Sequence, residues 1–270
     1  MNNDPKNFPN IALYISHGGG PLPLLGDPGH KEMVGVLEHL AEILEKPSAI
    51  IVISAHWEAG TPVITAGENP PLIYDYYGFP KESYEIQYPA PGAPVLAKKI
   101  FDVLKSNGIE ATLDEARGFD HGLFVPLKIM YPAADIPCIQ LSLIDTLDPE
   151  QHIQLGKALS GLLNGNILVL GSGFSFHNLK AFFSASSTVE QSMNELFEQW
   201  LIDTCTSRGM NESEREQRLV NWEKASAARY CHPREEHLLP LHVCYGFARS
   251  PAKQVFTFNI MGKKASVYLW

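Results

Sequence analysis

The sequence of 270 residues contains no apolar run that approaches the roughly 20 residues of a membrane-spanning helix. Basic residues are also scarce, because 21 Lys and Arg stand against 30 Asp and Glu and leave a formal net charge of -9. This balance argues against a nucleic-acid binder that depends on phosphate contacts, and against a polybasic membrane anchor. The N-terminal MNNDPKNFPN lacks the cationic and apolar regions of a signal peptide.

Cysteine is equally sparse. The four cysteines are scattered and form no C-x-x-C pair; they are Cys138, Cys205, Cys231 and Cys244. This usage predicts reduced thiols in a cytoplasmic protein.

The motifs of several common enzyme classes are missing. Neither G-x-G-x-x-G nor G-x-x-x-x-G-K-[ST] occurs, so nucleotide cofactors have no positive support. The stretch G-S-G-F-S matches the hydrolase elbow G-x-S-x-G only loosely, because Ser172 lies one position early. No cluster of Arg and Lys stands near the other motifs to hold a phosphate.

Short apolar runs alternate with helical patterns along the chain. Such runs suit strands that are buried on both faces of a mainly parallel sheet. The expected strands are Ile11–Ile15, Ala49–Ser54, Ile136–Leu143 and Ile167–Leu170, with a terminal hairpin of Val255–Asn259 and Ala265–Leu269. The expected helices are His30–Lys46, Ala93–Leu104, Glu150–Leu163, Val189–Thr206 and Glu236–Phe247. The pattern predicts one α/β domain over residues 1–270, with a mainly parallel central sheet flanked by helices.

The segment Pro62–Pro94 is rich in Pro, Tyr and Gly and is too long for a plain connection. Loops of this length are usually functional or carry small elements of their own.

The ten histidines fall into different settings. His30, His39 and His152 lie among charged residues in or beside amphipathic helices, which predicts solvated surface positions. His17, His56, His121 and His177 instead lie in turn-prone stretches: S-H-G-G-G, S-A-H-W-E, G-F-D-H-G and F-S-F-H-N-L. Three of the four come shortly after an expected buried strand. Because loops at the carboxyl ends of parallel strands converge, we expect these side chains to meet at one edge of the sheet.

A further pair, Glu236 and His237, precedes the last expected helix. Glu236 stands among charged residues and is expected to be the more solvated, whereas His237 is followed four positions later by Leu241 and is expected to point inward. Imidazoles bind Zn, Fe, Cu or Ni and transfer protons near neutral pH. Two histidines with one carboxylate would be the ferrous oxygenase pattern, and three neutral ligands with water would suit zinc.

These segments, together with P-P-L-I-Y-D-Y-Y-G-F-P, Y-P-A-P-G-A-P, A-D-I-P-C-I-Q-L-S-L and E-H-L-L-P-L, resemble the class III extradiol ring-cleavage dioxygenases. The resemblance is greater to the 4,5-DOPA dioxygenase branch and covers nearly the whole chain in order. It implies a divalent metal, Fe(II) for activity with Zn(II) expected in purified protein, and opening of a catechol ring beside its hydroxyls by O2.

The resemblance also implies roles for particular residues. His17 and His56 match the metal-binding histidines, and His237 is the expected third ligand. His177 matches the acid–base catalyst and is also expected as a further metal ligand, as in zinc-containing members of the family. His121 matches a histidine that contacts the substrate oxygen. The aromatic residues Trp57, Tyr74, Tyr76, Tyr77 and Phe79 are candidate pocket walls, although ordinary packing explains each one singly as well.

The chain departs from the family pattern after His17, where Gly19 and Gly20 replace the Ser and Pro of many relatives, which predicts a more flexible loop. Two other functions stay open from the residues. One is a zinc-dependent hydrolase on the same histidines, and the other is a metal-binding protein without oxygen chemistry. The expected partners are a small catechol and O2, with neither nucleic acid nor membrane; the sequence does not predict the oligomeric state.

Overall fold

The computed structural model describes residues 10–162, 165–183 and 187–270. Two predictions fall partly outside these residues. One concerns the N-terminal segment MNNDPKNFPN, of which the first nine residues are not described, and the other is the helix end at Leu163.

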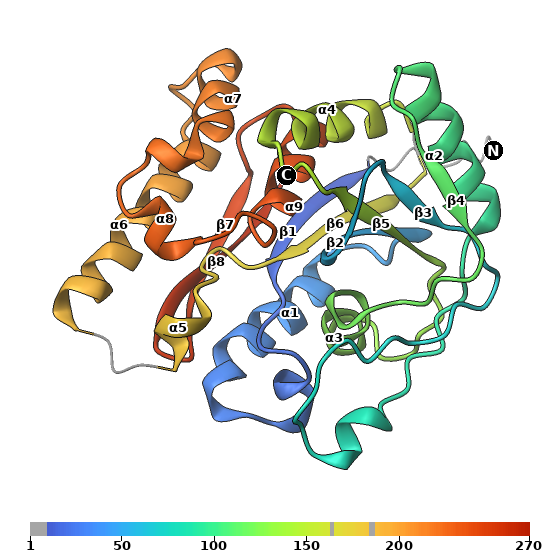
Figure 1. The fold of residues 1–270 in the computed structure, drawn as a ribbon, viewed down its shortest axis with the longest axis horizontal. Helices are drawn as coiled ribbons and strands as arrows, with labels where there is room; N and C mark the ends of the chain where they lie inside the picture. The colour runs from blue at the N-terminus through green and yellow to red at the C-terminus, as the bar shows by residue number, and fades with distance from the viewer. Residues whose placement is uncertain (1–9, 163–164, 184–186) are drawn as a thin grey trace, which may run out of the picture.

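A single mixed sheet forms the centre of the molecule (Figure 1), and within the described residues it has eight strands in the order β4-β3-β5-β2-β6-β1-β8-β7. The inner strands β5, β2, β6 and β1 are parallel to one another. Strand β3 pairs antiparallel with β5 and parallel with β4, β8 pairs antiparallel with β1, and β7 pairs with β8 as a hairpin. The strands are β1 (Ile11–Ser16), β2 (Ala49–Ala59), β3 (Val63–Thr65), β4 (Thr112–Asp114), β5 (Cys138–Ile144), β6 (Ile167–Gly173), β7 (Gln254–Ile260) and β8 (Lys263–Leu269). The expected α/β fold with a mainly parallel sheet is confirmed.

Helices cover both faces of the sheet (Figure 1). Helices α1 (Lys31–Ile43) and α3 (His121–Met130) lie on one face, and α4 (Pro149–Leu159) and α9 (Leu239–Ala248) lie on the other. The remaining helices are α2 (Pro94–Ser106), α5 (Leu179–Phe182), α6 (Thr188–Thr206), α7 (Glu212–Val220) and α8 (Ala228–Cys231). Strand residues alternate between the two cores, since Leu13 and Ile15 pack on the side of α1 while Ala12 and Tyr14 pack on the opposite side.

Several local features differ from the sequence prediction. Strand β2 continues five residues beyond Ser54, so His56 lies inside the strand, and its register with β5 shifts between Ile53 and Glu58. Helix α3 has no counterpart in the sequence prediction, and Pro126 lies within it. The long segment 62–94 holds β3, the short 3-10 helix η3 (Lys81–Tyr84) and two isolated bridges, Leu72 with Phe119 and Gly92 with Cys138, and its last residue begins α2. The other short 3-10 helices are η1 (Leu22–Leu25), η2 (Pro28–His30) and η4 (Trp222–Lys224).

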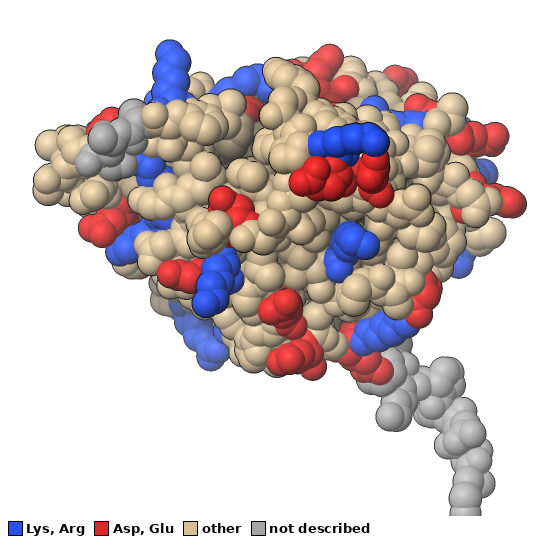
Figure 2. Space-filling view, turned by 90° about the horizontal axis from the view of Figure 1, so that it is seen from below, with Lys and Arg blue, Asp and Glu red and all other residues tan. Residues whose placement is uncertain are grey.

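Acidic and basic side chains are intermixed on the face shown in Figure 2, without a block of either sign. In the described part of the chain, no helix has the length and apolar character needed to span a membrane. The four cysteines are buried and free.

Candidate metal and substrate site

Five histidines from distant parts of the chain meet at the carboxyl edge of the sheet. They are His17 after β1, His56 in β2, His121 at the first position of α3, His177 beyond β6 and His237 ahead of α9. The rings of His17 and His237 have centroids 5.3 Å apart, those of His56 and His121 4.0 Å, and those of His177 and His237 3.4 Å with the planes nearly parallel. The structure therefore brings together all five histidines that the sequence singled out.

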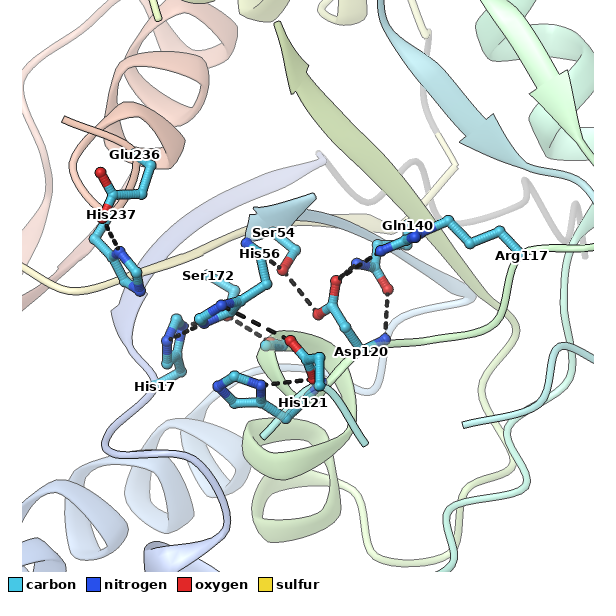
Figure 3. Close-up of polar contacts among 12 residues, drawn as sticks. His17, Ser54, His56, Arg117, Asp120, His121, Gln140, Ser172, Glu236 and His237 are labelled. Atoms are coloured by element: carbon cyan, nitrogen blue, oxygen red, sulfur yellow. Dashed lines mark hydrogen bonds and ion pairs between the residues drawn. The ribbon is translucent and has the colours of Figure 1, made fainter. Parts of the chain in front are cut away.

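The closest polar contact in the cluster joins two ring nitrogens, Nε2 of His17 and Nε2 of His56, at 3.0 Å (Figure 3). The ligand nitrogens of these two residues and of His237 all lie within 4.8 Å of one another. His17 and His237 are buried, and His56 keeps a side-chain exposure of 22% toward the cavity. Three nitrogen donors thus surround one point that solvent can reach.

The ring of His17 has a defined tautomer because of Ser172 on the neighbouring strand. The Ser172 hydroxyl donates to the carbonyl of Gly122, so it is left to accept from Nδ1–H of His17 at 3.0 Å. Consequently, Nε2 of His17 carries a lone pair and faces His56. Ser172 has no part in a hydrolase triad here; it orients a ring nitrogen.

The carboxylate of Asp75 fixes the tautomer of His121 in the same way. Oδ1 of Asp75 accepts from Nδ1–H of His121 at 2.8 Å and from its backbone N–H at 3.0 Å, while Oδ2 lies 3.8 Å from Nδ1 of His56. Burial alone would raise the pKa of Asp75, but the hydrogen bonds and charge interaction with His121 lower it overall. Asp75 therefore stays ionised, and His121 presents Nε2 to the cavity.

Glu236 lies behind two of the rings. Its Oε1 is 2.9 Å from Nδ1 of His237 and 3.2 Å from Nδ1 of His177, and its Oε2 is 3.5 Å from Arg234. Burial opposes ionisation, but hydrogen bonds from His177 and His237 outweigh it and hold the pKa of Glu236 far below its usual range. Glu236 is 9% exposed, so the expectation that it is solvated is wrong. Its side chain faces inward and pairs with both rings.

The backbone of His237 is fixed by strand β6 and by Tyr14. Its carbonyl accepts from Phe174 N–H and from the Tyr14 hydroxyl, both at 2.9 Å. A Cβ on Gly173 would lie 2.1 Å from that carbonyl oxygen, so only glycine allows this close approach.

A buried Asp lies behind the cluster. Asp120 accepts hydrogen bonds from Ser54 at 2.8 Å and from Gln140, and lies 3.5 Å from Arg117 (Figure 3). Burial and the nearby Asp75 raise the pKa of Asp120. Because Asp120 is the N-cap of α3, this network fixes the start of the helix that carries His121.

Burial and neighbouring rings keep the central imidazoles neutral. Burial and then the charges of nearby histidines lower the pKa of His17 and His56 well below the ordinary value, and they lower that of His237 to about 3. Neutral rings have free lone pairs, which metal binding requires.

The glycine loop after His17, Gly18–Gly20, is held by His30, which the sequence analysis predicted to lie at the surface. His30 is fully buried; its Nδ1–H donates to Asp27 at 2.6 Å, and its Nε2 accepts from Gly19 N–H at 3.0 Å. Gly18, at φ +87°, packs against the ring of His30. The prediction of a solvated His30 is therefore wrong.

His152 is also fully buried, with Nδ1–H donating to Asp148 O and Nε2 accepting from Ile144 N–H, so its predicted surface position is wrong too. His39 is exposed, as predicted.

The five histidines form the floor of an open cavity of about 460 Å³. Its walls are the glycine loop and a set of mainly apolar side chains: Leu22, Tyr76, Tyr77, Phe79, Phe174, Leu179, Phe182, Phe183 and Met261. Of the five aromatic residues that the sequence suggested, Tyr76, Tyr77 and Phe79 line the cavity. Trp57 instead stacks under Arg117 at 4.1 Å, and Tyr74 donates its hydroxyl to Ile86 O.

Comparison with known proteins shows the family of the chain. Residues 12–268 match the family described as the catalytic LigB subunit of aromatic ring-opening dioxygenase. The chain is 40% identical to a dioxygenase, tasH, of Hapsidospora irregularis, over 96% of this chain and 85% of that protein. It is 38% identical to a 4,5-DOPA dioxygenase extradiol of Mirabilis jalapa, over 90% and 89% of the two chains.

A similar enzyme of Escherichia coli K12, also named 4,5-DOPA dioxygenase extradiol, is 36% identical over 85% of this chain and 82% of that one. A crystal structure of an uncharacterised protein of Escherichia coli K12 superposes with a TM-score of 0.76 at 30% identity, over 96% of this chain and 98% of that one. The chain therefore belongs to the LigB family of class III extradiol ring-opening dioxygenases, in its DOPA dioxygenase-like branch.

Proposed function

We propose that this protein is an extradiol dioxygenase that opens the ring of a catechol, DOPA or a related phenol, with O2, and that His17, His56 and His237 hold its divalent metal. The observation that carries the proposal is the convergence of three neutral imidazoles at the floor of an apolar, open cavity. We further propose that residues 1–270 act as one catalytic unit.

The residues fit a metal ion. Nε2 of His17 holds a lone pair because its Nδ1–H is engaged by Ser172, and it faces Nε2 of His56 at 3.0 Å. A cation between the rings would satisfy both nitrogens, and the carboxylates of Asp75 beside His56 and of Glu236 beside His237 would supply compensating charge. Two further groups in the described chain could hold an ion, but each uses a carboxylate whose oxygen already accepts from histidine N–H groups.

Fe(II) is the metal that we propose for ring opening, and Zn(II) is one that three imidazoles would also accept. Held by His17, His56 and His237, such a metal would supply the redox chemistry between the catechol and O2. Around it, His177 lines the cavity next to His237, with Nδ1 on Glu236. We assign to its Nε2 the removal of a catechol hydroxyl proton and the return of a proton as the ring opens.

His121 is assigned a contact with the substrate oxygen. Asp75 fixes its ring orientation through two hydrogen bonds to one oxygen, so Asp75 acts as a positioning residue. The aromatic wall of Tyr76 and Phe79 excludes water beside the ring to be cleaved.

The test is to load the apoprotein with Fe(II) without oxygen, add a panel of catechols with air, and follow oxygen uptake and the yellow semialdehyde products. We expect uptake that is lost in His56→Ala and kept in His39→Ala, whose side chain is exposed and outside the cavity. No uptake with any catechol by iron-bound protein would rule against the proposal. Ester hydrolysis by the zinc-bound form would instead favour the hydrolase, and catechol binding without turnover would favour a non-catalytic metal protein.

A further inference from the structure

The wall of the cavity above the histidines is almost uncharged. Apart from the five imidazoles, none of the described residues that line it is Lys, Arg, Asp or Glu. Two cations close to the histidines have other partners: Arg117 lies over Trp57 and near Asp120, and Arg234 pairs with Glu58 through two contacts of 2.6 Å. Lys180, next to Leu179, is exposed on α5 but does not line the cavity. Among the described residues that line the cavity, a substrate carboxylate would therefore find no Lys or Arg to pair with.

The groups behind the floor are carboxylates. Asp75 and Glu236 both lie directly behind rings that line the cavity. A catechol that binds a divalent metal brings negative charge of its own on its oxygens. A second anionic group on the same substrate would meet repulsion, and it would lose hydration without a compensating ion pair.

The mouth of the cavity is apolar and exposed. Eight large apolar side chains are exposed among the described residues, and three of them, Tyr77 at 90%, Phe183 at 82% and Leu179 at 59%, line this one cavity. Such a concentration of exposed apolar surface around a single opening indicates a binding surface for an apolar group. The cavity volume of about 460 Å³ also leaves room beyond one aromatic ring.

We infer that the substrate is a catechol whose ring carries an uncharged, apolar extension that lies between Leu179, Phe183 and Tyr77. The inference rests on the proposed function for its catechol head group. A cavity for such a substrate differs from one for a catecholic amino acid, because the carboxylate and ammonium groups of an amino acid would both need charged or polar partners.

The test measures binding apart from turnover, with Zn(II)-loaded protein titrated calorimetrically without oxygen. The matched ligands are 4-(3-methylbutyl)catechol and 3-(3,4-dihydroxyphenyl)propanoate, which have side chains of similar shape and differ in charge; catechol, dopamine and DOPA complete the panel. Because each buried methylene contributes about fourfold in affinity, burial of three to five carbons of the methylbutyl group should make this compound bind roughly 10²–10³-fold more tightly than catechol. We expect the affinity of the methylbutyl compound to exceed that of the propanoate by at least about tenfold.

Two leucines of nearly equal exposure provide the variants. Leu179 lines the cavity, whereas Leu196 on α6, exposed at 56%, does not. Leu179→Ala should lower the preference for methylbutylcatechol over catechol about fivefold, and Leu179→Arg should shrink the discrimination against the propanoate about tenfold. The same changes at Leu196 should alter neither ratio.

Tighter binding of the propanoate, DOPA or dopamine than of the methylbutyl compound would overturn the inference, as would equal effects at Leu179 and Leu196. The proposed function fails separately: if the Fe(II) protein takes up no oxygen but the Zn(II) protein keeps the expected order of affinities, the binding preference stands without ring opening. If no catechol binds, both fail.

Discussion

Replacing Ser172 with alanine tests whether the orientation of His17 determines metal affinity. The Ser172 hydroxyl is fully buried and connects Nδ1–H of His17 to the carbonyl of Gly122. Ser172→Ala leaves both of these buried groups without a partner, at a cost of roughly 1–3 kcal/mol each. Part of that cost lowers the free energy of unfolding of the apoprotein. The rest appears in metal binding, because His17 no longer has one preferred tautomer.

The expected loss in metal affinity is about 10–100-fold, the usual effect of removing a group that orients a ligand histidine. This corresponds to about 1.4–2.7 kcal/mol. The assay is competition for Co(II) between the protein and a chromophoric chelator, with the stability of the apoprotein measured in parallel by denaturant unfolding.

Ser142→Ala is the matched control. Ser142 is also a fully buried serine on a central strand, and its hydroxyl accepts from Val63 N–H at 2.9 Å, outside the histidine cluster. We expect it to destabilise the fold without changing the metal affinity. If Ser172→Ala and Ser142→Ala lose similar stability and both keep the wild-type Co(II) affinity, the role assigned to Ser172 is wrong.

Three other predictions follow from the same contacts. His177→Phe should lower kcat by roughly 10²–10⁴-fold while the protein keeps its metal, which metal analysis and oxygen uptake measure together; loss of metal with normal turnover per bound ion would make His177 a ligand only. Gly18→Ala should destabilise the protein by roughly 2–3 kcal/mol, since φ is +87° and the new Cβ would lie 2.8 Å from the His30 ring. Gly26→Ala, at φ +75° with nothing within 4 Å, should cost only about 1 kcal/mol, and equal costs in denaturant unfolding would exclude crowding as the cause. Burial lowers the pKa of His152 from 6.5 to about 4, so the unfolded chain takes up its proton first as the pH falls. The stability that neutral His152 provides is complete above about pH 6.5 and declines down to pH 4, by about 2 kcal/mol between pH 7 and pH 5. His152→Gln should remove this part of the pH dependence from unfolding curves of the apoprotein, and an unchanged pH dependence would contradict it.

The sequence alone predicted the fold class and identified the five histidines of the site. Continuous apolar runs such as Ile11–Ile15 indicate strands whose two faces are both buried, and this pattern predicts a parallel sheet. Because the carboxyl ends of parallel strands share one edge, the sequence placed His17 and His56 at the same edge of the sheet, and the structure brings their rings together there. The family resemblance then supplied the expected roles, and family membership is confirmed.

Only the tertiary structure decided which groups stand behind those histidines. Ser172 lies 155 residues from His17, and Asp75 lies 46 residues from His121. Neither pairing has a local sequence signal, because it depends on strand register and on the path of a long, irregular segment. For the same reason the burial of His30, His152 and Glu236 escaped prediction: charged neighbours along the chain indicate solvent, but packing between distant elements determines what each side chain contacts.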